Sequence, residues 1–162
     1  MRPAIARSRS AALLVVVVVA AAGCSASESA TSSTITPVED DAVTAVVYRS
    51  ATCGCCKSYE DYLRRHGFGV TSEVTEEMDS VKSLRGIPAD AESCHTAVIG
   101  DYVVEGHVPV EAIEKLLDER PDVDGIAVAG MPLNSPGMGE PDGQPIEVLS
   151  INDGRTAPFA RI

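Results

Sequence analysis

Residues 42–67 read AVTAVVYRSATCGCCKSYEDYLRRHG, and they carry the signals of a strand, a turn and a helix. The run Ala42–Tyr48 is apolar and rich in β-branched residues, which predicts a buried strand. In Lys57–His66 the apolar residues recur at helical spacing, and Gly67 is suited to ending the helix. Three cysteines lie between these two elements, at a strand-to-helix turn.

The cysteine motif is Cys53-Gly54-Cys55-Cys56. At a helix N-terminus, unsatisfied N–H groups and the positive end of the helix dipole favour thiolate over thiol. Thiolate is both a nucleophile and a metal ligand, so the motif is suited to redox or metal chemistry. Cys53 and Cys56 form a Cys-x-x-Cys pair and are the candidate catalytic dithiol. Cys55 is an extra thiol, which a metal cluster can use and a plain dithiol oxidoreductase does not need.

The N-terminal segment has the composition of a secretory signal peptide. Arg2, Arg7 and Arg9 precede a short apolar stretch, Ala11–Ala22, and the ending at Cys24 resembles the bacterial lipobox. An ordinary signal peptide or a signal anchor is the alternative, but the stretch is short for a membrane span.

These signals predict the layout of the N-terminal part. We expect residues 1–23 to be a signal peptide, Cys24 to be lipidated, and residues 24–41, rich in Ser and Thr, to be a flexible tether. The protein would then be extracytoplasmic and held at the cell membrane only by its lipid. Three of the 13 basic side chains precede Cys24, so 10 basic and 24 acidic ones remain, a formal charge of −14. That charge disfavours nucleic acid as a partner, and we expect a monomer.

The rest of the chain predicts an α/β fold. After the first strand and helix we expect a strand at 69–74, a helix at 78–84, a hairpin of strands 96–99 and 102–105, and a helix between Pro109 and Pro121. This order, β-α-β-α-β-β-α, is thioredoxin-like and defines a domain over 42–121. An extension over 122–162 would add a short strand at 125–128, a Pro/Gly/Met loop, and a final hairpin of strands 146–151 and 156–160.

The turn at Gly100-Asp101 fixes which residues face each other across the first hairpin. Residues equidistant from the turn pair, so Cys94 lies opposite His107 and His95 opposite Gly106. In a thioredoxin-like sheet this end of the hairpin lies beside the cysteine-rich turn. The candidate metal ligands that should converge there are Cys53, Cys55, Cys56, Cys94, His95 and His107.

The ligand types favour copper. Thiolate and thioether are soft ligands that select Cu(I), and imidazole is compatible with it. Zn²⁺ also binds Cys and His, but thioether is a poor zinc ligand, so Met131 and Met138 favour copper. More than four candidate ligands indicate a multinuclear site. Each candidate also has a structural interpretation: a buried small side chain for Cys94, a hydrogen-bonded His for His95, a helix-entry residue for His107, and gap filling for the methionines.

Several separate motifs, in order, resemble the CopG-like copper-resistance proteins. They are Cys53-Gly54-Cys55-Cys56, Ser93-Cys94-His95-Thr96-Ala97, Val104-Glu105-Gly106-His107-Val108-Pro109, Gly130-Met131-Pro132 and Ser135-Pro136-Gly137-Met138. The resemblance implies a thioredoxin-like domain with a metal-binding C-terminal extension and a cysteine-bridged multicopper site. It also implies a role in interconverting Cu(I) and Cu(II) in the cell envelope. The partners we expect are copper ions and copper-export or copper-carrier proteins. Ala129 and Gly139 depart from the residues usual in that family.

Three functional hypotheses follow. The first is an envelope copper-binding redox protein that contributes to copper resistance. The second is a thiol–disulfide oxidoreductase acting on protein cysteines through Cys53 and Cys56, and the third is a zinc-binding interaction domain. A Cys53–Cys56 disulfide is compatible with the spacing, whereas Cys55 and Cys56 would bridge each other only with strain.

Overall fold

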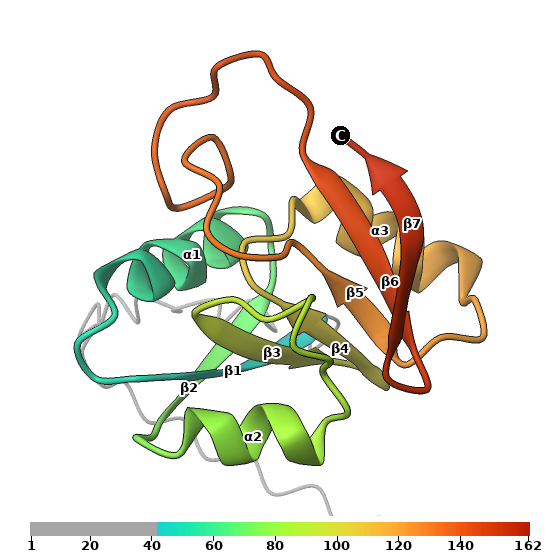
Figure 1. Ribbon diagram of the computed structural model, residues 1–162. Helices are drawn as coiled ribbons and strands as arrows, with labels where there is room; N and C mark the ends of the chain where they lie inside the picture. The colour runs from blue at the N-terminus through green and yellow to red at the C-terminus, as the bar shows by residue number, and fades with distance from the viewer. Residues whose placement is uncertain (1–41) are drawn as a thin grey trace, which may run out of the picture. The chain divides into compact units, whose positions relative to one another are not determined.

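Seven strands and three helices make up residues 42–162, the part of the chain that the computed structural model describes (Figure 1). The strands are β1 (Thr44–Arg49), β2 (Gly69–Val74), β3 (His95–Ile99), β4 (Tyr102–Glu105), β5 (Gly125–Ala127), β6 (Glu147–Asn152) and β7 (Arg155–Arg161), and the helices are α1 (Gly54–Arg65), α2 (Met78–Leu84) and α3 (Val110–Glu119). The predicted order β-α-β-α-β-β-α is present, followed by the predicted short strand and hairpin. The predictions for residues 1–41, Cys24 among them, fall outside the described residues.

All seven strands belong to one mixed sheet in the order β2-β1-β3-β4-β5-β6-β7. β1 and β2 are parallel, as expected for two strands joined by the crossover helix α1. β3 runs antiparallel to both β1 and β4, and β5 returns parallel to β4. The residues after 121 therefore extend the same sheet, with β6 and β7 forming its far edge.

The helices cover the two faces of the sheet unequally. The larger core joins one face of the central strands to α1 and α3, through side chains such as Tyr59, Leu63, Ile113 and Leu116. α2 lies on the opposite face, below the central strands in Figure 1, and a smaller apolar cluster of Ile87, Ala91, Val103, Ala127 and Ile151 lies on that side. In residues 42–162 no helix has the length and apolar character needed to cross a bilayer.

The cysteine-rich turn sits where β1 meets α1. The helix starts at Gly54, three residues earlier than the apolar spacing alone predicts, because Cys53 acts as its N-cap. The Cys53 sulfur accepts a hydrogen bond from the Cys56 N–H at 3.3 Å. Cys55 and Cys56 are therefore in the first helical turn.

The predicted hairpin register is correct. Thr96 pairs with Glu105 and Ile99 with Tyr102 on either side of the Gly100-Asp101 turn. One step further from the turn, the Gly106 N–H donates to the His95 carbonyl at 3.0 Å. Gly106 has a φ of 74°, and a Cβ there would lie 2.6 Å from the Val128 carbonyl oxygen, so only glycine fits where the chain leaves β4.

Candidate metal centre

Cys53 and Cys56 are joined by a disulfide in the first turn of α1, with their Cα atoms 5.4 Å apart. Cys53 is half-buried and Cys56 is fully buried. The Cys-x-x-Cys spacing therefore brings these two sulfurs together, as the dithiol hypothesis requires. In this state neither sulfur is a thiolate, so neither can bind a metal ion until the disulfide is reduced.

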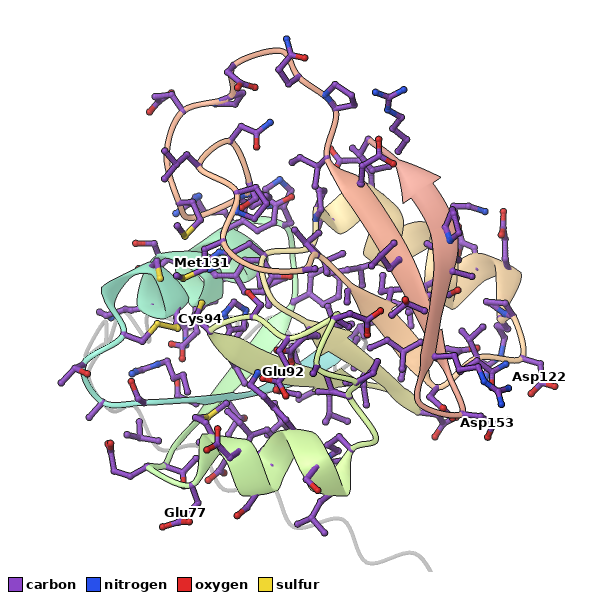
Figure 2. All side chains as sticks on the ribbon, in the orientation of Figure 1. Glu77, Glu92, Cys94, Asp122, Met131 and Asp153 are labelled. Atoms are coloured by element: carbon purple, nitrogen blue, oxygen red, sulfur yellow. A yellow bond between two sulfur atoms is a disulfide. The ribbon has the colours of Figure 1, made fainter. Side chains whose placement is uncertain are left out.

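Four sulfur atoms gather at this turn, and we call Cys53, Cys55, Cys56 and Cys94 the sulfur group. The Cys55 sulfur lies 3.5 Å from that of Cys53 and 3.8 Å from that of Cys94, and the Cys56 and Cys94 sulfurs are 3.6 Å apart. Two thiolates bound at about 2.3 Å to one tetrahedral ion lie about 3.8 Å apart. These three spacings therefore suit metal coordination once the Cys53–Cys56 disulfide is reduced. Figure 2 shows yellow sulfur atoms beside the labelled Cys94.

A second set of ligand atoms shares Cys94, and we call Cys94, His95 and His107 the mixed group. The Cys94 sulfur lies 3.4 Å from His95 Nδ1 and 3.1 Å from His107 Nε2. Both imidazoles are fully buried, and their ring centroids are 4.8 Å apart. The predicted pairing of Cys94 with His107 across the hairpin is thus seen directly in the sulfur–nitrogen contact.

His107 is held with one ring nitrogen facing the cysteine sulfur. Its Nδ1 donates a hydrogen bond to the Pro136 carbonyl oxygen at 2.7 Å, which leaves the Nε2 lone pair directed at Cys94. Metal-binding histidines commonly donate their other N–H to a carbonyl in this way. Burial lowers the pKa of His107, which keeps the imidazole neutral and able to bind a metal ion.

His95 is packed against Tyr59 but is incompletely hydrogen-bonded. The two ring centroids are 4.6 Å apart, and the Tyr59 hydroxyl donates to the Val108 carbonyl at 2.9 Å. His95 Nε2 is buried without a hydrogen-bond partner, which is rare for a buried polar atom. Burial, followed by the charges of His107 and Lys82, lowers the pKa of His95, so this ring too is neutral.

The surroundings of Cys94 disfavour its thiolate form. Burial, together with the neighbouring Cys55 thiol, raises the pKa of Cys94 to about 12. A bound cation would provide the positive charge that the surrounding residues do not. The chemistry of the donor set, soft sulfur beside neutral imidazole, therefore fits a soft metal ion such as Cu(I) and would also accept Zn²⁺.

A buried ion pair behind the site was not found from the sequence. Lys82 of α2 donates to Glu105 of β4, and both side chains are buried. Glu105 also accepts hydrogen bonds from the Ser93 N–H and the Thr96 hydroxyl, each at 2.6 Å. Glu105 therefore holds Ser93 and Thr96, the residues before and after Cys94-His95, from the opposite face of the sheet. The sequence signal for this ion pair was Glu105, a charged residue at an inward-facing position of an otherwise hydrophobic strand.

The Pro/Gly/Met loop is anchored beside the cysteines. The Ser93 hydroxyl donates to the Gly130 carbonyl, and the Gly130 N–H donates to the Glu92 carbonyl at 2.9 Å. Ser93 and Gly130 are therefore hydrogen-bonded to each other, and the residues that follow them in the sequence are Cys94 and Met131. At Gly137, with a φ of 81°, a Cβ would lie 2.8 Å from the Tyr59 nitrogen, so the loop packs tightly on α1.

The predicted site residues differ in how far the structure gathers them. The four cysteines and two histidines form the two groups described above. Met131 is 54% exposed and Met138 is half-buried. The loop that carries both methionines borders the site, so their role as ligands stays a prediction.

Comparison with known proteins identifies relatives over most of the chain. A family described as "Protein of unknown function, DUF411" matches residues 91–138. No curated protein matches the sequence. Among solved structures, "Copper resistance protein copG- Form 2" is 43% identical with a TM-score of 0.70, and "Copper resistance protein copG- Form 1" is 42% identical with a TM-score of 0.69. Each match covers 75% of this chain, and 99% and 98% of the two relatives respectively.

The matched family region, residues 91–138, contains Cys94, His95 and His107, and the two solved relatives are matched over nearly their whole length. The resemblance inferred from the cysteine, histidine and methionine motifs is confirmed: the chain belongs to the CopG family of copper resistance proteins.

Proposed function

We propose that this protein binds copper in the cell envelope and contributes to copper resistance. The observation that carries the proposal is the convergence of four sulfurs and two buried imidazoles in two groups that share Cys94, each with its ligand atoms within 4.8 Å of one another. Membership of a family whose solved members are named copper resistance proteins supports copper as the metal. Copper is the cargo of this site, and soft thiolates favour Cu(I).

The number of ligands supports a multinuclear site. Six Cys and His side chains exceed the four that one tetrahedral ion needs. Cys94 is common to the sulfur group and the mixed group, so its thiolate is the natural bridge between two ions. Met131 and Met138 would add thioether ligands at the loop side of the site.

A redox role is part of the proposal. Oxidation of the Cys53 and Cys56 thiolates to their disulfide releases two electrons, which reduce two Cu(II) ions to two Cu(I) ions. The disulfide seen in the structure is the oxidised member of that couple. An external reductant, such as a reduced dithiol protein, would restore the thiolates.

The fold that presents these residues is, we propose, thioredoxin-like over residues 42–121. The strand order β2-β1-β3-β4 with the cysteine motif after β1 supports this assignment. The second candidate function, thiol–disulfide exchange through Cys53 and Cys56, is favoured by the same disulfide at the start of α1. A zinc-binding interaction domain is the third.

The test is the metal content of protein purified from cells grown with added copper. We expect more than one copper per chain and little zinc by elemental analysis. One tightly held zinc per chain with no copper would overturn the proposal in favour of the zinc-binding domain. No bound metal, combined with strong disulfide reductase activity, would favour the oxidoreductase.

A further inference from the structure

The sulfur group and the mixed group have only one residue in common. The sulfur group takes Cys53, Cys55 and Cys56 from the start of α1, whereas the mixed group takes His95 and His107 from the β3–β4 hairpin. Cys94 belongs to both. Apart from Cys94, the two groups are therefore held by different elements, and their other residues can be substituted separately.

The disulfide affects the two groups differently. It removes Cys53 and Cys56 from the sulfur group, which leaves that group with two free thiols, Cys55 and Cys94. It removes nothing from the mixed group, because neither His95 nor His107 nor Cys94 takes part in it. All three mixed-group ligand atoms remain within 4.8 Å of one another while the disulfide is intact.

We propose that the mixed group, Cys94 with His95 and His107, is a separate copper-binding half-site that works while Cys53 and Cys56 are disulfide-bonded. The inference rests on the proposed copper-binding function and goes beyond it. The oxidised protein binds one copper ion at the mixed group. The sulfur group accepts further copper only after the two-electron reduction of the disulfide to two thiolates.

The mixed group is already arranged for binding in the disulfide form. A sulfur and an imidazole nitrogen bound to one tetrahedral ion lie about 3.5 Å apart, given bond lengths of about 2.3 and 2.0 Å. The two sulfur–nitrogen distances from Cys94 are 3.4 and 3.1 Å, so only small movements are needed. Two imidazoles with one thiolate is a donor set that proteins use for copper.

The hydrogen bond of His107 points to the same conclusion. The Pro136 carbonyl fixes which nitrogen of His107 carries the proton, so the other nitrogen keeps its lone pair. His95 Nδ1 faces the Cys94 sulfur at 3.4 Å, whereas its Nε2 is the buried atom without a hydrogen-bond partner. A metal ion shared with Cys94 would bind at Nδ1.

The protein would therefore bind copper in two stages. A protein with its disulfide closed still captures one ion, and a protein with its disulfide reduced captures more. Copper capacity therefore follows the redox state of the Cys53–Cys56 pair, although the first ion does not depend on it.

The experiment titrates purified full-length protein anaerobically with Cu(I) in competition with a colorimetric Cu(I) chelator. One sample keeps the disulfide, and the other is reduced with a phosphine and desalted. Free thiols are counted before and after loading, to show that the disulfide survives in the first sample. We expect one Cu(I) per chain in the oxidised sample, with mixed nitrogen and sulfur ligation by X-ray absorption, and more than one in the reduced sample.

Variants separate the two groups. His107→Gln, which keeps a donor toward the Pro136 carbonyl, should weaken Cu(I) binding by the oxidised protein by at least about 10-fold, since even loss of a supporting hydrogen bond costs that much. Cys55→Ser should lower the capacity of the reduced protein. His66→Ala is the matched control, because His66 is exposed and bonds only the Tyr62 carbonyl. Circular dichroism checks that each variant is folded.

The outcomes separate this inference from the proposed function. Copper binding by the reduced protein alone, or oxidised-state binding that His107→Gln leaves unchanged, would overturn the separate half-site and leave the proposed function standing. Failure of both samples to bind Cu(I) would overturn both. One ion in the oxidised protein, lost in His107→Gln and kept in His66→Ala, would establish the half-site.

Discussion

Cys94 connects the two parts of the site because its sulfur lies within 4 Å of two cysteine sulfurs and two histidine nitrogens. Its position is set by neighbours that are not ligands. The Ser93 N–H is held by Glu105, and the hairpin places Cys94 opposite His107. A residue in this position suits a bridging thiolate, and its raised pKa means that a metal ion is needed to keep it ionised.

Cys55 distinguishes a metal cluster from a dithiol enzyme. In Cys55→Ser, Cys53 and Cys56 can still attack and resolve, so thiol–disulfide exchange should stay within about twofold of wild type, since both thiols needed for exchange remain. Serine offers a hard oxygen in place of soft sulfur, so copper per chain should fall in the reduced protein. The measurement pairs copper stoichiometry with reductase activity on a small disulfide substrate. Strong disulfide turnover that survives the change, with weak copper binding in both proteins, would favour the oxidoreductase.

The candidate ligands could be predicted from sequence largely because two local rules place them. Hairpin register puts Cys94 opposite His107, and the Cys-x-x-Cys spacing puts Cys53 beside Cys56. The direction of a long, flexible side chain follows no such rule, so the ligand roles of Met131 and Met138 stay predictions.

At the scale of elements, α2 contributes to the site through Lys82. Its ion pair with Glu105 lies behind Cys94, and Glu105 in turn holds the Ser93 N–H. Nothing local in the sequence pairs Lys82 with Glu105, because the contact depends on how α2 packs on β3 and β4. Partners separated by 23 positions can be predicted only once the sheet is known.

Lys82→Met should be strongly destabilising. It leaves the Glu105 carboxylate buried without its cation, which typically costs about 3–5 kcal/mol of unfolding free energy. Urea unfolding of the oxidised protein measures this. Lys57→Met, an exposed lysine of α1, should change stability by less than about 0.5 kcal/mol. Equal stabilities for wild type and Lys82→Met would show that the buried pair contributes nothing.

A second ion pair joins β1 to α1 on either side of the cysteine-rich turn. The Arg49 Nε lies 2.7 Å from a Glu60 carboxylate oxygen, and Glu60 is buried. Burial alone would raise the pKa of Glu60. Hydrogen bonds from Ser72 and Arg49 and the charges of Arg49 and Arg64 outweigh it and lower the pKa.

The lowered pKa of Glu60 gives its contribution a definite pH dependence. A depressed carboxyl pKa stabilises the folded state above the unfolded value of about 4.3, and this stabilisation is lost as pH falls through the folded-state value. Glu60→Gln should therefore lower the unfolding free energy by about 1.5–3 kcal/mol at pH 7, as expected for a hydrogen bond to a charged group, and by much less at pH 2–3. Asp61→Asn, half-exposed on the same helix, is the control and should cost less than about 1 kcal/mol at either pH. A Glu60→Gln deficit that is the same at both pH values would contradict this account.

At the scale of the whole molecule, the C-terminal extension is structurally continuous with the rest. β5, β6 and β7 continue the sheet, and the loop between β5 and β6 supplies the carbonyl that orients His107. The sequence predicted the elements of this extension, because a short apolar run and an Asn-Asp-Gly hairpin are local signals. The attachment of β5 beside β4 depends on long-range packing and was not predicted.

The predicted lipid anchor is tested by Cys24→Ala. The variant should move from the membrane fraction to the soluble extracytoplasmic fraction, because the lipid would be its only attachment. Copper bound per chain should be unchanged, since the predicted ligands all lie in residues 53–138. Fractionation with immunodetection measures the first effect. Membrane retention equal to wild type would refute the lipoprotein assignment.

The central claim is that the cysteine and histidine cluster binds copper. Its most direct test is copper X-ray absorption on the reduced protein after anaerobic loading with Cu(I), combined with copper and protein quantification on the same sample. We expect more than one copper per chain, sulfur as the dominant ligand with a nitrogen contribution, and loss of both signals in Cys94→Ser. Fewer than one copper per chain, or oxygen and nitrogen ligation that Cys94→Ser leaves unchanged, would contradict the claim.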